Sequence, residues 1–233
     1  MSRAPGSAFR PVACKLVLEL VVVVLGITIS FWFQDWRDRR ADRQQEAQLL
    51  SGLGNELRND LADLRARSRQ IELGIEHVRQ LLVPEAIAKS ERDLDLAMDA
   101  LLSYVAFSPL RATYVELQQL GGSRLVRDKN VLHQVLSIHE RVYPMATEWD
   151  GINRSFVLDR VFPYLDANGP SFEVDMKGQT AHGYHKAFLF LSGRNEFRNL
   201  LRSAVVFKEG QHAVYQALIA AVTKVLLVLP AGG

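Results

Sequence analysis

The sequence predicts an all-α protein in which one N-terminal transmembrane helix continues into an antiparallel helical bundle of four or five helices. Three observations support this prediction. A long apolar run lies near the N-terminus, apolar residues then recur at helical spacing over most of the chain, and Pro and Gly residues separate the recurring stretches.

The composition limits the class of protein. A length of 233 residues suits one domain with an anchor, and a hydrophobic content of 48% is enough for a buried core. The 28 basic and 26 acidic residues leave a net charge of +2, which lacks the basic surplus of a nucleic-acid-binding protein. The single cysteine, Cys14, excludes an intramolecular disulfide and a multi-cysteine zinc site. We therefore expect no nucleic acid partner and no cofactor.

The apolar run predicts a transmembrane helix over residues 16–34, preceded by a short basic tail over 1–15. As a helix the run spans about 27 Å, close to the thickness of the hydrocarbon core of a bilayer. Trp32 and Trp36 stand at its C-terminal end, where we expect them to be interfacial anchors in the headgroup layer. No small-residue cleavage site follows the run, so the segment is expected to stay attached rather than to be removed as a signal peptide.

Glu19 is a carboxylate inside the apolar run, and helix geometry predicts that it shares a face with Gly26 and Ser30. At about 100° per residue, each of these two residues lies about 20° from Glu19. The small-xxx-small spacing of Gly26 and Ser30 allows a second helix to approach closely, and a carboxylate on the same face can hydrogen-bond across such a contact. This interpretation predicts a homo-oligomer or another membrane protein as partner. In the alternative, Glu19 reaches back to the interface beside Lys15, and Gly26 reflects ordinary membrane composition.

Four stretches of the chain carry a similarity to a known family. The first is the span, with Glu19, the Val-rich run 21–25, Gly26 and the exit sequence QDW at 34–36. The others are LLSGLGNELRNDL at 49–61, TYVELQQLGGSRLVRDKNVLHQVLSIHE at 113–140 and FRNLLRSAVVFKEGQHAVYQALI at 197–219. In these stretches the chain resembles the uncharacterised bacterial single-pass membrane proteins that have an N-terminal span and a helical domain of unknown function. The region 170–191 departs from the pattern.

The resemblance implies a location and a topology, but no activity. Arg and Lys residues are nearly balanced on the two sides of the span, so the positive-inside rule alone leaves the orientation open. The resemblance implies the bacterial inner (plasma) membrane, a cytoplasmic N-terminus and a periplasmic helical domain.

After the span, residues 35–229 are predicted to form the helical bundle domain. Apolar residues recur at intervals of seven in its first part, at Leu50, Leu57, Leu64, Ile71 and Val78. This spacing predicts a long amphipathic helix, which Pro84 ends. The helix belongs either to the bundle or to a dimeric coiled-coil stalk. Interruptions of the seam at Asp60, Arg67 and Gly74 favour the bundle.

Caps and breakers predict the next helices. Ser90 caps a helix that is expected to end at Ser108-Pro109, and a shorter helix over 110–120 ends at Gly121-Gly122. Asp128 caps a longer segment that reaches about residue 165 and is interrupted by two prolines, Pro144 and Pro163.

The C-terminal third is predicted to contain an irregular insertion over 170–191 and a last helix over 195–229, followed by the tail 230–233. The apolar end of the last helix contains Lys224, whose charge favours a bundle helix over a second span. No internal repeat is evident.

The sequence contains two candidate clusters of ligand-binding side chains. His182, His185 and Asp175 form a weak candidate metal site, because the two histidines are three residues apart; the alternative is solvent-exposed loop histidines. A candidate polar cluster combines one tyrosine with three arginines, namely Arg111, Tyr114, Arg124 and Arg127. It is either an anion site or an ordinary helix cap with its packing.

The sequence favours a binding protein over an enzyme. It contains no Gly-rich phosphate loop, no Gly-x-Ser-x-Gly elbow and no His-Glu-x-x-His helix. The first hypothesis is a membrane-anchored accessory or scaffold protein of the bacterial envelope that acts by protein–protein interaction. The alternative is an extracytoplasmic small-ligand sensor that signals through a partner, since only the tail 1–15 would lie in the cytoplasm. The third is an enzyme with an unrecognised site in the region 170–191.

Overall fold

The computed structural model describes residues 9–170 and 183–229, and all regular secondary structure in these two ranges is helical. The prediction of an all-α protein is therefore confirmed. The elements are α1 (Phe9–Gln80), η1 (Pro84–Ala88), α2 (Glu91–Leu102), α3 (Ala112–Gln119), α4 (Gly122–Leu125), α5 (Lys129–Ser137), η2 (Ile138–Val142), α6 (Tyr143–Phe156), η3 (Val157–Val161), α7 (Phe162–Asn168), α8 (Tyr184–Leu191) and α9 (Asn195–Leu226).

The chain forms two compact units, Met1–Leu49 and Leu50–Gly233. α1 continues without a break past the apolar segment and through this boundary. Two helical stretches in the described ranges, Glu19–Gln80 and Asn195–Val228, are long and apolar enough to cross a membrane. The most apolar window of the first is 0% buried, whereas that of the second is 28% buried. A core helix of a soluble protein can have the same length and apolar composition. The first stretch differs from the second because its most apolar window is fully uncovered.

Local capping groups set several helix ends where the sequence predicted them. The Ser90 hydroxyl accepts a hydrogen bond from the Asp93 N–H at 3.2 Å and caps the start of α2. Asp128 accepts two backbone N–H groups of the first turn of α5. Gly121 follows α3 with a φ of 70°, a left-handed conformation that glycine adopts at no steric cost. These predictions are confirmed.

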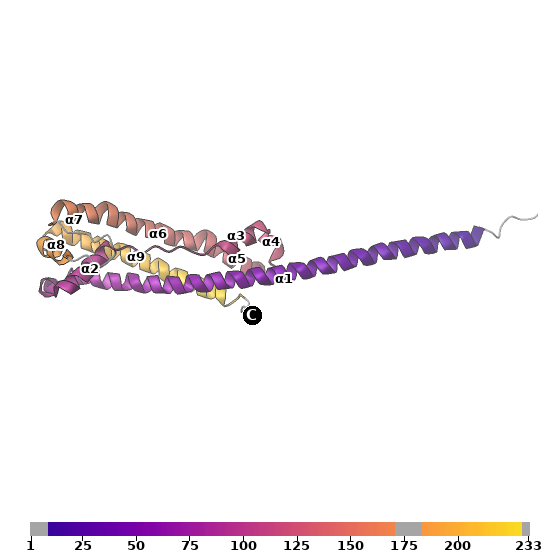
Figure 1. The fold of residues 1–233 in the computed structure, drawn as a ribbon, viewed down its shortest axis with the longest axis horizontal. Coiled ribbons are helices and arrows are strands. Elements are labelled where there is room, and N and C mark those ends of the chain that lie inside the picture. The colour runs from indigo at the N-terminus through magenta and orange to yellow at the C-terminus, as the bar shows by residue number, and fades with distance from the viewer. Residues whose placement is uncertain (1–8, 171–182, 230–233) are drawn as a thin grey trace, which may run out of the picture. The chain divides into compact units, whose positions relative to one another are not determined.

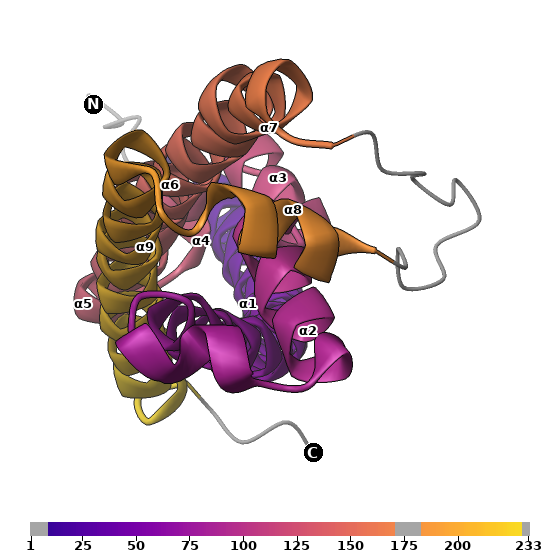
Figure 2. The same ribbon diagram turned by 90° about the vertical axis from the view of Figure 1, so that its left-hand side faces the viewer.

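Three long helical rods build the second unit (Figure 1): the part of α1 from Leu50 onward, the rod formed by α5, η2, α6, η3 and α7, and α9. Figure 2 views this unit from the end where α2 and α8 lie, and shows the rods around a common core. Contacts with its two neighbours show the direction of α9. Its contacts with α1 are Arg79–Glu209 and Ser68–Gln216. Its contacts with the second rod are Tyr164–Phe197 and Asp150–Tyr215. In each case the residue numbers run in opposite senses, so α9 is antiparallel to both rods. The α1 rod and the second rod therefore run in the same direction, and the expected antiparallel order does not hold for this pair.

An extended strap, residues 103–111, connects the end of α2 to the start of α3. The expected helix up to Ser108-Pro109 is wrong in this part, because α2 ends at Leu102. The strap brings the chain back along the bundle before the second rod begins, as Figure 1 shows. Because the chain returns along the bundle in this strap and not in a long helix, the rods that precede and follow it in the sequence run in the same direction.

Pro144 and Pro163 do not break the second rod, because one π-helical turn precedes each of them. In both turns the N–H of the residue before the proline bonds to the carbonyl five residues back, Tyr143 to Ile138 and Phe162 to Val157. A proline in regular α-helix clashes with the carbonyl four residues back and cannot bond to it. The wider turn relieves this clash, so the helix continues through the proline.

The two π turns share a sequence pattern of acid, Arg, Val, aromatic residue and Pro. It reads ERVYP at 140–144 and DRVFP at 159–163. The expectation of no internal repeat is therefore wrong for this short pattern. Arg141 and Arg160 hold the same position in the two turns, and both are exposed.

The expected irregular insertion over 170–191 is wrong for its last part, because α8 occupies Tyr184–Leu191. Residues 171–182 lie outside the described residues. The helix starts after Gly183, which has a φ of 110°, and packs against α2. It buries Ala187, Phe188 and Leu191, which stand at helical spacing. α8 has only eight residues, which is too few for its apolar residues to show a clear helical periodicity in the sequence.

Candidate functional site

The contact face predicted on the apolar segment is exposed: Glu19, Gly26 and Ser30 all lie at the surface of α1. A hollow of about 470 Å³ lies at Gly26 and Ser30, and its other lining residues are Val23, Ile27, Phe31 and Gln34. A Cβ added to Gly26 would meet nothing within 4 Å. The Ser30 hydroxyl donates to the Gly26 carbonyl at 2.8 Å, so its proton is used within the helix. A helix packed against this face would therefore have to supply the donor for a hydrogen bond to Ser30.

Both predicted anchors, Trp32 and Trp36, are exposed on α1. The Trp36 ring lies 5.8 Å from the ring of Phe33, measured between centroids, and the Arg40 guanidinium lies 5.7 Å from the Trp36 centroid. Asp35 and Arg39 form an ion pair of 2.6 Å on the following turn. Aromatic rings thus give way to charged side chains within two turns, as is typical of the end of an interfacial segment.

The structure brings only part of the predicted polar cluster together. Tyr114 is buried and stacks on His139, with 4.1 Å between the ring centroids and 10° between the ring planes. Arg111 lies near enough to affect the titration of His139. Arg124 in α4 and Arg127 after it are exposed. The cluster is therefore centred on a histidine that the sequence analysis did not single out.

His139 is buried, and neither ring nitrogen has a hydrogen-bond partner among the described residues. Its ring is nearly perpendicular to the ring of Tyr143, with 5.1 Å between the centroids and 87° between the planes. Burial, together with the positive charge of Arg111, lowers the pKa of His139 to about 4. The imidazole is thus neutral at pH 7 and packs as an aromatic ring. A general acid or base must reach a substrate proton, which a side chain only 3% exposed does not do here.

Asp150 forms the centre of a buried network that holds the strap. Its carboxylate accepts the Phe107 N–H at 2.8 Å and the Gln211 side-chain amide at 2.7 Å, and it accepts the Tyr215 hydroxyl at 3.0 and 3.1 Å. Gln211 also donates to the Val105 carbonyl at 3.0 Å. Burial and the adjacent carboxylate raise the pKa of Tyr215 well above its usual range. The network satisfies backbone groups that no helix or sheet would satisfy.

Two further buried side chains bond to the strap. Lys208 donates to the Ser103 carbonyl at 2.9 Å, and burial lowers the pKa of Lys208 to about 8. Asp60 accepts the Leu110 N–H at 3.0 Å and the Tyr143 hydroxyl at 2.7 Å, and burial raises the pKa of Asp60. A buried polar or charged group is costly unless it is hydrogen-bonded, and here the strap supplies the partners. These residues have a structural role.

The candidate metal site is described only at His185, because Asp175 and His182 lie outside the described residues. His185 Nδ1 lies 3.1 Å from Asp95 Oδ1, and its Nε2 lies 3.7 Å from Glu91 Oε1. The backbone N–H of His185 also donates to Asp95, at 2.7 Å. The side chain therefore joins α8 to α2 instead of lying in an exposed loop. No group of three or more His, Cys, Asp or Glu side chains in the described ranges is arranged to hold a metal ion.

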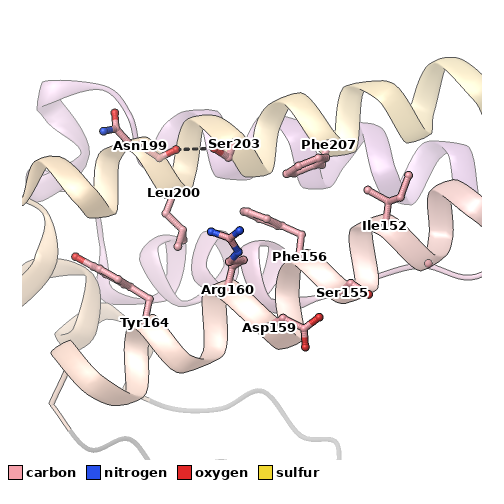
Figure 3. Close-up of a pocket in the computed structure, with 11 residues that line it drawn as sticks. Ile152, Ser155, Phe156, Asp159, Arg160, Tyr164, Asn199, Leu200, Ser203 and Phe207 are labelled. Atoms are coloured by element: carbon pink, nitrogen blue, oxygen red, sulfur yellow. Dashed lines mark hydrogen bonds between the residues drawn. The ribbon is translucent and has the colours of Figure 1, made fainter.

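A groove of about 830 Å³ lies between the second rod and α9 (Figure 3). Its apolar lining consists of Ile152, Phe156, Tyr164, Leu200 and Phe207, and its polar lining consists of Ser155, Asp159, Arg160, Asn199 and Ser203 together with Gly151. This volume falls within the range of small-molecule sites in proteins. The groove could not be predicted from the sequence, because its two walls are far apart along the chain.

Two charged residues line the groove, and they point in different directions. In Figure 3 Arg160 extends from η3 toward α9, between Phe156 and Leu200, while Asp159 points away from α9. Arg160 has no hydrogen bond or ion pair with any of the described residues. The repeated pattern of the π turns was a signal in the sequence that would have drawn attention to this arginine.

Comparison with known proteins gives no match: no family model matches the chain, and no characterised protein or solved structure shows significant similarity to it. The resemblance to uncharacterised single-pass membrane proteins therefore stays a prediction.

Proposed function

We propose that this protein is a membrane-anchored accessory or scaffold protein of the bacterial envelope, and that it acts by protein–protein interaction through its N-terminal span. In this proposal residues 16–34 cross the inner membrane once, with the N-terminus in the cytoplasm and the helical bundle in the periplasm. The face of Glu19, Gly26 and Ser30 contacts a second helix, either from another copy of the chain or from another membrane protein.

The observation that carries the proposal is the exposure of the apolar segment. Between residues 20 and 33 its large apolar side chains are exposed, namely Leu20, Val21, Val22, Val23, Val24, Leu25, Ile27, Ile29, Phe31, Trp32 and Phe33. An apolar surface of this size favours burial in lipid or in a partner. The hollow at Gly26 gives one side of the segment a shape that a second helix can fill.

Cross-linking and co-purification of the full chain from native membranes test the contact face. The test compares the wild type with two variants, Glu19→Leu and Gly26→Leu. We expect both to reduce recovery of the cross-linked species, because the first removes the hydrogen-bonding carboxylate and the second fills the hollow. The size of the cross-linked species separates self-association from association with a partner.

Thr28→Leu is the matched control, because Thr28 lies about 180° around the helix from Glu19. The Thr28 hydroxyl donates to the Val24 carbonyl within α1, so its loss removes no donor from a contact. If neither variant on the Glu19 face differed from Thr28→Leu, the span-mediated form of the proposal would be abandoned.

The second candidate function, a small-ligand sensor that signals through a partner, is favoured by the groove between the second rod and α9. Of the described pockets in the bundle unit, this groove has the size and the mixed apolar and polar lining of a ligand site. Saturable binding of a small ligand to the full chain in nanodiscs, together with loss of that binding in the Leu200→Trp variant, would support this function. Unchanged binding in the Leu200→Trp variant would count against it.

A further inference from the structure

We propose that the groove between the second rod and α9 binds the carboxylate of a single-chain alkyl anion, a medium-chain fatty acid, with Arg160 as the residue that contacts the carboxylate. This inference rests on the second proposed function, the ligand sensor, and is independent of what the span contacts.

Aromatic pairs join the two helices that form the walls of the groove. Phe156 and Phe207 meet across it with 4.8 Å between their centroids, and Tyr164 stacks near Phe197 at 6.2 Å with 10° between the ring planes. The two helices are therefore in side-chain contact at both places. From Ile152 to Tyr164 the second rod rises roughly 18 Å, so the groove is elongated.

Contacts between the two walls decide between an alkyl chain and a partner helix. A helix with its side chains is about 10 Å wide and would need the two walls to separate. The walls are held together by the Phe156–Phe207 contact and, one turn beyond, by Gly210. A Cβ at Gly210 would come within 2.4 Å of the Trp149 ring, so the backbone of α9 lies directly against that side chain. A groove whose walls are joined by these contacts suits one flexible chain.

Arg160 determines the charge of the occupant. Its side chain is exposed, extends toward α9 between Phe156 and Leu200, and has no hydrogen bond or ion pair with the described residues. Guanidinium groups bind carboxylates through paired, charge-assisted hydrogen bonds. Asp159, the neighbouring acid, points away from α9 and does not occupy this position. An anionic head group complements the site.

The position of Arg160 along the groove sets the length of the ligand. It stands eight residues after Ile152, which corresponds to roughly 12 Å of helix rise, and only four residues before Tyr164. A carboxylate at Arg160 would therefore direct its alkyl chain past Phe156 and Phe207 toward Ile152. This distance fits a medium-length chain. The single guanidinium, with roughly 12 Å of groove beyond it, matches one carboxylate on one chain of medium length.

The two π turns place their arginines differently. Arg160 belongs to η3, the π-helical turn that precedes Pro163, and lines the groove. The related turn η2 has Arg141 at the same position, but Arg141 does not line the groove. The chain thus supplies its own matched control for Arg160.

Equilibrium dialysis tests the inference with the full chain in zwitterionic nanodiscs, after subtraction of binding to empty nanodiscs. The probes are decanoate, decanol and decylamine, which share a chain and differ in charge. We expect saturable binding of one decanoate per chain, with decanol bound about tenfold more weakly and decylamine more weakly still, because only the carboxylate forms charge-assisted bonds to Arg160.

Charge reversal provides the decisive comparison. Arg160→Glu is expected to reverse the preference, so that decylamine binds better than decanoate, whereas Arg141→Glu leaves the wild-type preference unchanged. Leu200→Trp, which fills the groove, is expected to abolish binding of all three probes. A photoreactive decanoate should label peptides of α6 and α9 in the wild type.

Four results would overturn the inference. Equal affinity for the three probes, lost in Leu200→Trp, would mean that the groove accepts apolar ligands without regard to charge; the sensor function would then survive. Displacement of decanoate by nanodiscs that contain an anionic two-chain lipid, in the wild type but not in Arg160→Glu, would mean that the ligand is a phospholipid. Binding of no probe, or identical binding in Leu200→Trp, would remove both the inference and the ligand-sensor function.

Discussion

The Tyr215 hydroxyl bonds to both carboxylate oxygens of Asp150, at 3.0 and 3.1 Å, and so joins α9 to the second rod in the core. The same carboxylate accepts the Phe107 N–H, so one side chain connects two rods and the strap. Both Tyr215 and Asp150 are buried. Because a buried polar group without a partner is costly, the network makes the position of the strap depend on these residues.

We predict that Asp150→Ala lowers the free energy of unfolding by about 3 to 5 kcal/mol, because it leaves the Phe107 N–H, the Gln211 amide and the Tyr215 hydroxyl without their acceptor. Asp150→Asn keeps two acceptor sites on its amide oxygen and should cost less. Denaturant unfolding of the full chain measures both. The control is Asp166→Ala, at an exposed residue of α7, which should change stability by less than about 0.5 kcal/mol. A loss for Asp150→Ala no larger than for the control would contradict the structural role of the network.

We predict that His139 makes the protein less stable in acid. Its folded pKa of about 4 lies below the ordinary value of 6.5, so between these pH values the unfolded chain binds the proton more readily than the folded chain. This contribution to stability is complete above pH 6.5 and is lost as the pH falls to 4, with a maximum of about 3 kcal/mol. Unfolding measured between these two pH values should show the loss. His139→Phe keeps an aromatic ring between Tyr114 and Tyr143 and should remove this part of the pH dependence; an unchanged profile would show that other groups cause it.

We predict opposite effects for two glycine substitutions in facing helices. Gly210→Ala should destabilise the protein by about 1 to 3 kcal/mol, because the new Cβ would meet the Trp149 ring at 2.4 Å. Gly151→Ala should stabilise it by about 0.5 to 1 kcal/mol, since a Cβ there meets nothing within 4 Å and alanine is the better helix former. Thermal unfolding of the full chain compares them. Trp149→Leu in the Gly210→Ala background should recover part of the loss, and failure to do so would locate the strain elsewhere.

The proposed topology predicts the labelling of cysteines by a membrane-impermeant maleimide. In spheroplasts the single native thiol, Cys14, should stay unlabelled until the membrane is permeabilised, because the N-terminus is proposed to be cytoplasmic. In a Cys14→Ser background, Gly193→Cys should be labelled at once. Gly193 is exposed, and a Cβ there meets nothing within 4 Å. The reverse labelling pattern would place the bundle in the cytoplasm.

Much of the helical framework could be predicted from local signals. Ser90 and Asp128 begin helices because their side chains reach N–H groups two or three residues away, and Gly121 ends one because of its own φ. The amphipathic spacing of the later part of α1 also predicts which residues are buried: Leu57, Leu64 and Val78 are fully buried.

The candidate sites could be predicted only in part. The exposed face of Glu19, Gly26 and Ser30 follows from helix geometry alone. The groove and Arg160 could not be predicted in this way, because the groove exists only where residues 151–164 and 199–207 come together.

The sequence by itself determined the all-α class, the uncovered apolar segment and most helix ends, because each depends on residues within one or two turns of one another. Tertiary structure alone decided the strap, whose N–H and carbonyl groups bond to side chains as distant as Lys208 and Gln211, more than one hundred residues along the chain from Ser103 and Val105. It also decided that the rod continues through Pro144 and Pro163, because packing of the rod against α9 outweighs the preference of proline to end a helix. Local propensity is a matter of tenths to a few kcal/mol, and long-range burial and hydrogen bonding override it wherever the two conflict.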